Sequence, residues 1–127
     1  MGKPLNVLIA DDSEDDVLLI VRALSREGFD VDYCQVDCHD EFETQLAARR
    51  WDIVLSDHLM PGFGSFEVLD IVKERQPSLP VIVVSGLGGE ANRLAALSAG
   101  ARAHIAKDNL GQLALEIDRE VLSARKP

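Results

Sequence analysis

Residues 5–13 read LNVLIADDS, so a run of mostly apolar residues leads directly into two aspartates and a serine. Residues 52–57 (DIVLSD) and 80–85 (PVIVVS) repeat this pattern of an apolar run followed by a polar residue. Short runs of Val, Ile and Leu without polar alternation are typical of strands that are buried on both faces. The sequence therefore predicts three central strands, at residues 5–10, 52–56 and 80–84.

Two weaker strands are expected at residues 31–36 and 102–106, and apolar residues at helical spacing occur between the strands. The positions with this spacing are Val17, Ile20, Val21, Leu24, Leu69, Val72, Leu94, Leu97, Leu110, Leu113, Ile117 and Val121. Ser13 with Asp16 matches a capping box, and Asn109 matches the N-cap of a last helix. Gly28 and Gly100 indicate helix ends.

This alternation of strands and helices predicts an α/β fold with a doubly wound, five-stranded parallel sheet and helices on both faces. Five strand–helix units are too few for an eight-stranded barrel. The alternation continues through residues 1–127, which we interpret as a single domain. In open sheets of this kind the ligand lies at the carboxyl ends of the strands.

The composition excludes several classes of protein. The 22 acidic and 13 basic residues give a net charge of −9, which argues against direct binding of nucleic acid. No apolar run approaches the roughly 18 residues of a membrane span, and residues 1–6 lack the apolar region of a secretory signal. We therefore expect a cytoplasmic protein with no membrane partner. Cys34 and Cys38 match neither a redox pair nor a zinc pair, so reduced thiols are expected.

Three carboxylates are predicted to meet at the carboxyl edge of the sheet. Asp11 and Asp12 follow the first strand, and Asp57 follows the third. Like charges in a partly buried cleft repel one another, so a cation should neutralise them, and carboxylate oxygens suit magnesium. For Asp11 and Asp12 alone, capping of the following helix is an equally good explanation. Asp57, on a different strand, favours the metal site.

Ser85 ends the fourth strand and Lys107 ends the fifth, so a hydroxyl and an ammonium group join the acids. Both groups can donate hydrogen bonds to phosphoryl oxygens. Phosphoryl transfer requires mainly positioning and neutralisation of charge, which magnesium, Lys107 and Ser85 would supply. Asp57 is then the nucleophile.

These residues resemble the receiver domain of two-component response regulators, over nearly the whole chain. The resemblance implies strand order 2-1-3-4-5, as in other flavodoxin-like folds, with Asp57 as phosphoacceptor, Ser85 as the switch hydroxyl and Lys107 as the family's lysine. It also implies that Asp12 binds magnesium directly and Asp11 partly through water. The backbone carbonyl of Leu59 is a further implied ligand.

The family's activity implies a signalling domain rather than an enzyme, although such domains promote their own phosphorylation and dephosphorylation. The phosphoryl group would come from a sensor histidine kinase or a phosphotransfer protein. It would switch binding to a downstream protein or a fused output domain. A receiver-like module that binds its partner without phosphorylation is the alternative. A nucleotide or flavin carrier is disfavoured, because residues 10–14 (ADDSE) contain no phosphate-cradling glycine.

The chain departs from the family's usual pattern at two positions. Asp108 follows Lys107 where most receivers have proline, often after a cis peptide, and this Lys-Asp variant also occurs in the family. His104 replaces the Tyr or Phe switch residue. We expect His104 to face outward towards the fourth helix, with Ala103 and Ile105 on the opposite face. Whether the ring merely fills space or swings inward on phosphorylation stays open.

Overall fold

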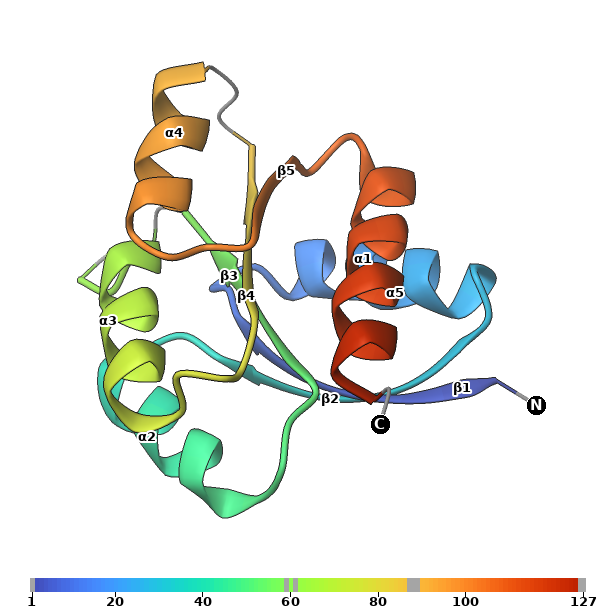
Figure 1. Ribbon diagram of the computed structural model, residues 1–127, viewed down its shortest axis with the longest axis horizontal. Coiled ribbons are helices and arrows are strands. Elements are labelled where there is room, and N and C mark those ends of the chain that lie inside the picture. Colours follow the sequence, from blue (N-terminus) through green and yellow to red (C-terminus); the bar gives the residue numbers. More distant parts are fainter. Residues whose placement is uncertain (1, 59, 61, 87–89, 126–127) are drawn as a thin grey trace.

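The computed structural model describes residues 2–58, 60, 62–86 and 90–125, which form alternating strands and helices (Figure 1). The elements are β1 (Lys3–Ala10), α1 (Glu14–Arg26), β2 (Phe29–Val36), α2 (His39–Ala48), β3 (Ile53–Asp57), α3 (Ser65–Arg75), β4 (Val81–Ser85), α4 (Glu90–Ser98), β5 (Ala103–Ala106) and α5 (Leu110–Arg125). Within the described ranges, no helix is long and apolar enough to cross a lipid bilayer.

All five strands pair in parallel, in the order β2-β1-β3-β4-β5. This confirms the predicted fold class and strand order, and each strand begins and ends within two residues of its predicted bounds. The chain starts in the middle of the sheet, adds β2 on one side and then crosses over to β3. The order therefore reverses beside β1, and ligands of open parallel sheets bind at such a reversal.

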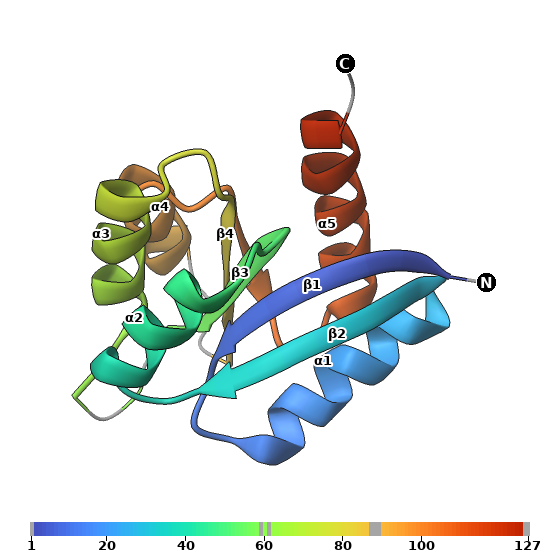
Figure 2. The ribbon, with the colours of Figure 1, turned by 90° about the horizontal axis from the view of Figure 1, so that it is seen from below.

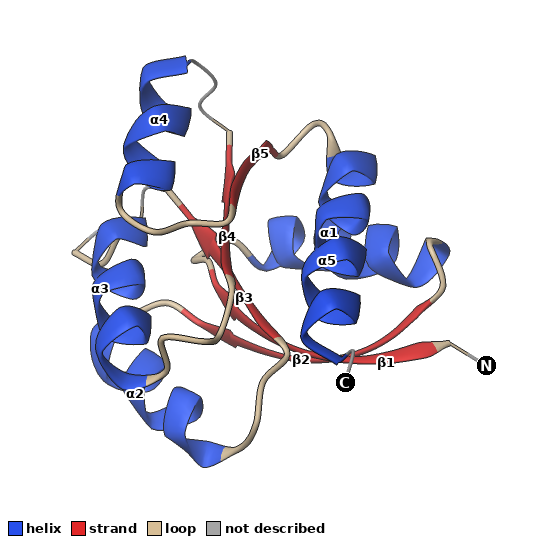
Figure 3. Ribbon diagram, viewed as in Figure 1, coloured by secondary structure: helices blue, strands red, loops and turns tan. Residues whose placement is uncertain are grey.

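Helices cover both faces of the sheet, with α1 and α5 on one face and α2, α3 and α4 on the other (Figures 2 and 3). Alternate residues of β1 serve the two faces. Val7 and Ile9 pack with α1 and α5, while Leu8 and Ala10 pack on the opposite side. Full burial of a large aliphatic side chain stabilises the fold by about 1.5–3 kcal/mol. Because helices cover both faces of the sheet, successive residues of β1 are buried on one face or the other, and apolar residues do not alternate with polar ones.

The helix ends agree with the sequence in part. Ser13 is the N-cap of α1, and its Oγ accepts a hydrogen bond from the backbone N–H of Asp16 at 3.3 Å. A capping box also requires the Asp16 side chain to accept from the N–H of Ser13. That part of the prediction is wrong, because this N–H donates to Asp11 Oδ1 at 2.8 Å. Gly28 and Gly100 follow α1 and α4 with φ of 96° and 111°, a left-handed conformation that favours glycine and ends a helix.

Candidate functional site

The carboxyl edge of the sheet brings the predicted polar residues into one region. Asp11 directly follows β1, Asp57 and Ser85 are the last residues of β3 and β4, and Lys107 follows β5. Asp57 lies opposite Val84 in the sheet, and Ser85 lies opposite Ala106. Parallel pairing alone therefore places four strand ends, and their polar side chains, side by side.

Carboxylate oxygens of Asp11, Asp12 and Asp57 lie within 4.8 Å of one another. Asp11 is buried, Asp57 is half-buried and Asp12 is exposed. Two full charges at such a separation repel by a few kcal/mol at an effective dielectric constant of about 20. An all-oxygen set with one solvent-facing member fits Mg²⁺, which binds through one or two carboxylates and keeps water or phosphate oxygens in its other positions.

Asp11 is held firmly by the backbone around it. Its Oδ1 accepts from the N–H of Ser13, and its carbonyl oxygen accepts from Gln35 Nε2 at 2.9 Å. Burial and the nearby charge of Asp57 raise the pKa of Asp11, although the Ser13 hydrogen bond and Lys107 partly oppose them. A cation at this position would favour the ionised form of Asp11.

Lys107 lies among three carboxylates from three elements. Its Nζ is 2.6 Å from Asp16 Oδ2, 3.3 Å from Asp11 Oδ2 and 3.5 Å from Asp57 Oδ1. Burial opposes the charged form, but the hydrogen bond to Asp16 and the charges of Asp11 and Asp57 together raise the pKa of Lys107 above its ordinary value. The side chain is therefore a fixed positive charge beside Asp57.

Sequence reasoning missed the role of Asp16 as the nearest partner of Lys107. Asp16 was interpreted only as part of a helix cap, and 91 positions separate it from Lys107. The sequence offers one hint of this contact, because Asp16 lies in the first turn of the helix that directly follows the acids Asp11 and Asp12. The packing of α1 against the sheet decides which distant side chain Asp16 contacts.

Ser85 is 1% exposed at the end of β4, and its carbonyl accepts from the N–H of Lys107 at 2.9 Å. The structure thus ties the serine and the lysine to each other through the backbone. The carbonyl of Leu59, predicted as a metal ligand, lies outside the described residues. Its role stays a prediction.

His104 lies on the face of the sheet that the sequence predicts. Its ring lies on the face covered by α4, as expected, and Ile105 packs on the opposite face with Ala103. The residue is partly buried, and its Nε2 atom is buried with no hydrogen-bond partner among the described residues. The ring meets His58 edge to face, with 6.2 Å between the centroids. His58 is the residue after Asp57, and its Nδ1 is 3.0 Å from Ser65 Oγ.

The backbone at the second departure is ordinary. No cis peptide bond occurs in the part of the chain that the structure describes, which includes the bond between Lys107 and Asp108. Proline is the residue that commonly permits a cis bond, and Asp108 has no such preference. Lys107 reaches the acids from a trans backbone.

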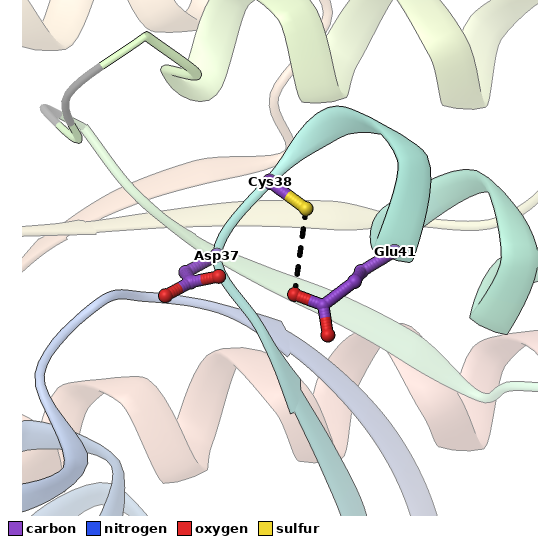
Figure 4. A group of neighbouring side chains, drawn as sticks. All are labelled: Asp37, Cys38 and Glu41. Atoms are coloured by element: carbon purple, nitrogen blue, oxygen red, sulfur yellow. Dashed lines mark hydrogen bonds between the residues drawn. The ribbon is translucent and has the colours of Figure 1, made fainter.

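A second group of potential ligands lies at the start of α2, where Asp37, Cys38 and Glu41 approach one another (Figure 4). The Cys38 thiol donates to Glu41 Oε1 at 3.4 Å. All three residues are exposed, whereas the Asp11 group includes buried and half-buried carboxylates. Exposed acids are screened by water, so this group needs no cation to neutralise it.

Comparison with known proteins agrees with this geometry. A family model for the response regulator receiver domain matches residues 7–118, and the chain belongs to that family. Among curated relatives, the nitrogen assimilation regulatory protein NtrX of Azorhizobium caulinodans is 31% identical over 123 residues, which are 94% of this chain and 27% of NtrX. The phosphate regulon transcriptional regulatory protein PhoB of Rhizobium meliloti is 29% identical over 103 residues, 80% of this chain and 44% of PhoB. The chain thus spans less than half the length of either relative.

Solved structures show the same fold. NtrX from Brucella abortus has a TM-score of 0.83 at 26% identity, covering 98% of this chain and 28% of that one. The receiver domain of the Francisella response regulator 1452 has a TM-score of 0.82 at 20% identity, with 95% and 99% of the two chains covered. The predicted family, the receiver domain of response regulators, is confirmed, and the domain is a signalling module.

Proposed function

We propose that Asp57 is the phosphoacceptor of this domain. The observation that carries the proposal is the position of Lys107 Nζ, 3.5 Å from Asp57 Oδ1, beside a group of acids able to hold a divalent cation. A negatively charged nucleophile that must meet a negatively charged phosphoryl group needs positive charge beside it. Lys107 supplies that charge from the protein itself.

In the proposed reaction, a carboxylate oxygen of Asp57 forms a bond to the phosphorus of the donor. The bond between phosphorus and the donor's imidazole nitrogen or oxygen breaks, and the leaving group keeps the electron pair. Lys107 neutralises charge on the transferring group, and the Ser85 hydroxyl donates to one of its oxygens. The domain thereby promotes its own phosphorylation. Hydrolysis of the acyl phosphate by water then releases inorganic phosphate and restores the Asp57 carboxylate.

Asp11, Asp12 and Asp57 would hold Mg²⁺, with the Leu59 carbonyl as the further ligand that the family resemblance implies. When bound, the ion would offset the negative charge of the acids and the phosphoryl oxygens. Asp57 would hold it from the end of β3, and Asp11 and Asp12 from the segment that follows β1. Asp12 is the exposed member of this group.

We further propose that residues 1–127 act as one receiver domain in the cytoplasm, phosphorylated by a sensor histidine kinase or a phosphotransfer protein. Ser85 and His104 would report phosphorylation to a downstream protein or a fused output domain. Ser85 ends β4, and His104 lies on the neighbouring strand β5. A movement of the Ser85 hydroxyl would therefore reach the face covered by α4.

The test is phosphorylation by acetyl phosphate with Mg²⁺, followed by intact mass. We expect one added phosphoryl group on the wild type, none on Asp57→Asn, and normal labelling of Asp70→Asn, an exposed aspartate on α3. Equal labelling of Asp57→Asn would overturn the assignment. An unlabelled wild type that binds its partner unchanged would favour the phosphorylation-independent module.

A further inference from the structure

The shortest contact of Lys107 is with Asp16 and not with the proposed phosphoacceptor. The distance from Nζ to Asp16 Oδ2 is 2.6 Å, a charge-assisted hydrogen bond, whereas 3.5 Å to Asp57 Oδ1 is an ion pair with a weaker hydrogen bond at most. Asp16 thus takes the best of the three N–H donors of the ammonium group. Its side chain is 34% exposed, against 12% for Asp57.

Asp16 also has a fixed position. It lies in the first turn of α1, next to the buried Val17, and its own N–H is bound to the Ser13 cap. The carboxylate therefore cannot follow the lysine far towards a phosphoryl group. Lys107, with its flexible stem, has to leave Asp16 if its ammonium group moves to a new anion on Asp57.

From this geometry we propose that Asp16 is a positioning residue that holds the Lys107 ammonium group before phosphorylation and competes with the phosphoryl group for it. Asp16 then slows phosphorylation of Asp57. This inference rests on the proposed function.

The experiment compares Asp16→Asn with Asp15→Asn. Asp15 is the neighbouring acid on α1 and is exposed, so the matched variant makes the same change in net charge next to the site without touching Lys107. We expect Asp16→Asn to accept phosphate from acetyl phosphate about two- to fivefold faster, the range that a partly exposed ion pair can supply. Asp15→Asn should match the wild type.

A second arm shows whether Asp16 acts through the lysine. In a Lys107→Gln background, Asp16→Asn should no longer change the rate, because no ammonium group is left to release. In the unphosphorylated, metal-free protein, Asp16→Asn should lower the pKa of Lys107, followed by NMR of its side chain. This readout requires no phosphoryl transfer.

The outcomes separate this inference from the proposed function. If the wild type and Asp16→Asn are both phosphorylated, and Asp16→Asn is labelled no faster, the proposed competition for Lys107 is overturned. Asp57 then remains the proposed phosphoacceptor. If Asp15→Asn speeds labelling by the same factor, the effect comes from the change in net charge and not from Lys107, and the inference is also overturned. If neither wild type nor Asp16→Asn accepts phosphate, the proposed function fails and the inference with it.

Discussion

At the scale of single residues, His104 stands where receiver domains usually carry Tyr or Phe, and an imidazole differs from both in its titration. Burial of the imidazole, followed by the nearby His58 and Arg93, lowers the pKa of His104 below its ordinary value. The ring is therefore held neutral in the folded protein under conditions in which an unfolded chain already binds a proton. Tyr or Phe at this position would not titrate in this range.

This difference gives a pH dependence with a definite sign. Because the unfolded state binds the proton more readily, the free energy of unfolding should fall as the pH drops through the ordinary pKa of about 6.5. We expect His104→Phe to lose less stability than the wild type between pH 7.5 and pH 5.5, measured by urea unfolding. The same loss in both proteins would show that His104 does not contribute to the acid sensitivity.

At the scale of one element, α1 connects the stability of the fold to the geometry of the site. The helix begins beside the acids, and its first turn carries Asp16, the partner of Lys107. The Ser13 hydroxyl satisfies an N–H group that the helix itself cannot pair. The cap and the lysine contact therefore depend on the same turn of helix.

We predict that Ser13→Ala lowers the free energy of unfolding by about 1 kcal/mol, the usual cost of losing an N-cap. Ser13→Asn, which keeps a capping oxygen, should restore most of that stability, as measured by urea denaturation. The backbone N–H of Ser13 still donates to Asp11 in both variants. If the Ala and Asn variants prove equally stable, the hydroxyl does not cap the helix.

At the scale of the whole molecule, the net charge of −9 and the group of carboxylates at one edge act against the compact state. A cation that binds the folded group, and not the dispersed acids of the unfolded chain, should relieve part of this repulsion. Because the cation binds only the folded state, the free energy of unfolding of the whole domain then rises with occupancy of this one site.

We expect Mg²⁺ at ten times its dissociation constant to add about 1.4 kcal/mol to the free energy of unfolding, seen as a higher melting temperature. Matched ionic strength from KCl should give a smaller rise, because monovalent salt only screens the charges. Asp12→Ala should abolish most of the Mg²⁺ effect. An undiminished shift in that variant would place the bound ion elsewhere.

The sequence by itself determined the class of fold, the strand order through the family resemblance, and the edge at which Asp11, Asp12, Asp57, Ser85 and Lys107 meet. The reason is local. Strands buried on both faces have an unmistakable composition, and parallel pairing sends every strand end to the same edge. A polar residue directly after such a strand needs no further information to be placed.

Only the tertiary structure decided how the side chains at that edge share their contacts. The pairing of Lys107 with Asp16 and the edge-to-face contact of His104 with His58 each join residues that lie far apart in the chain. Such contacts depend on how α1 and β5 pack against the rest of the sheet. That packing is set by many small apolar contacts summed over the whole core, and no single motif encodes it.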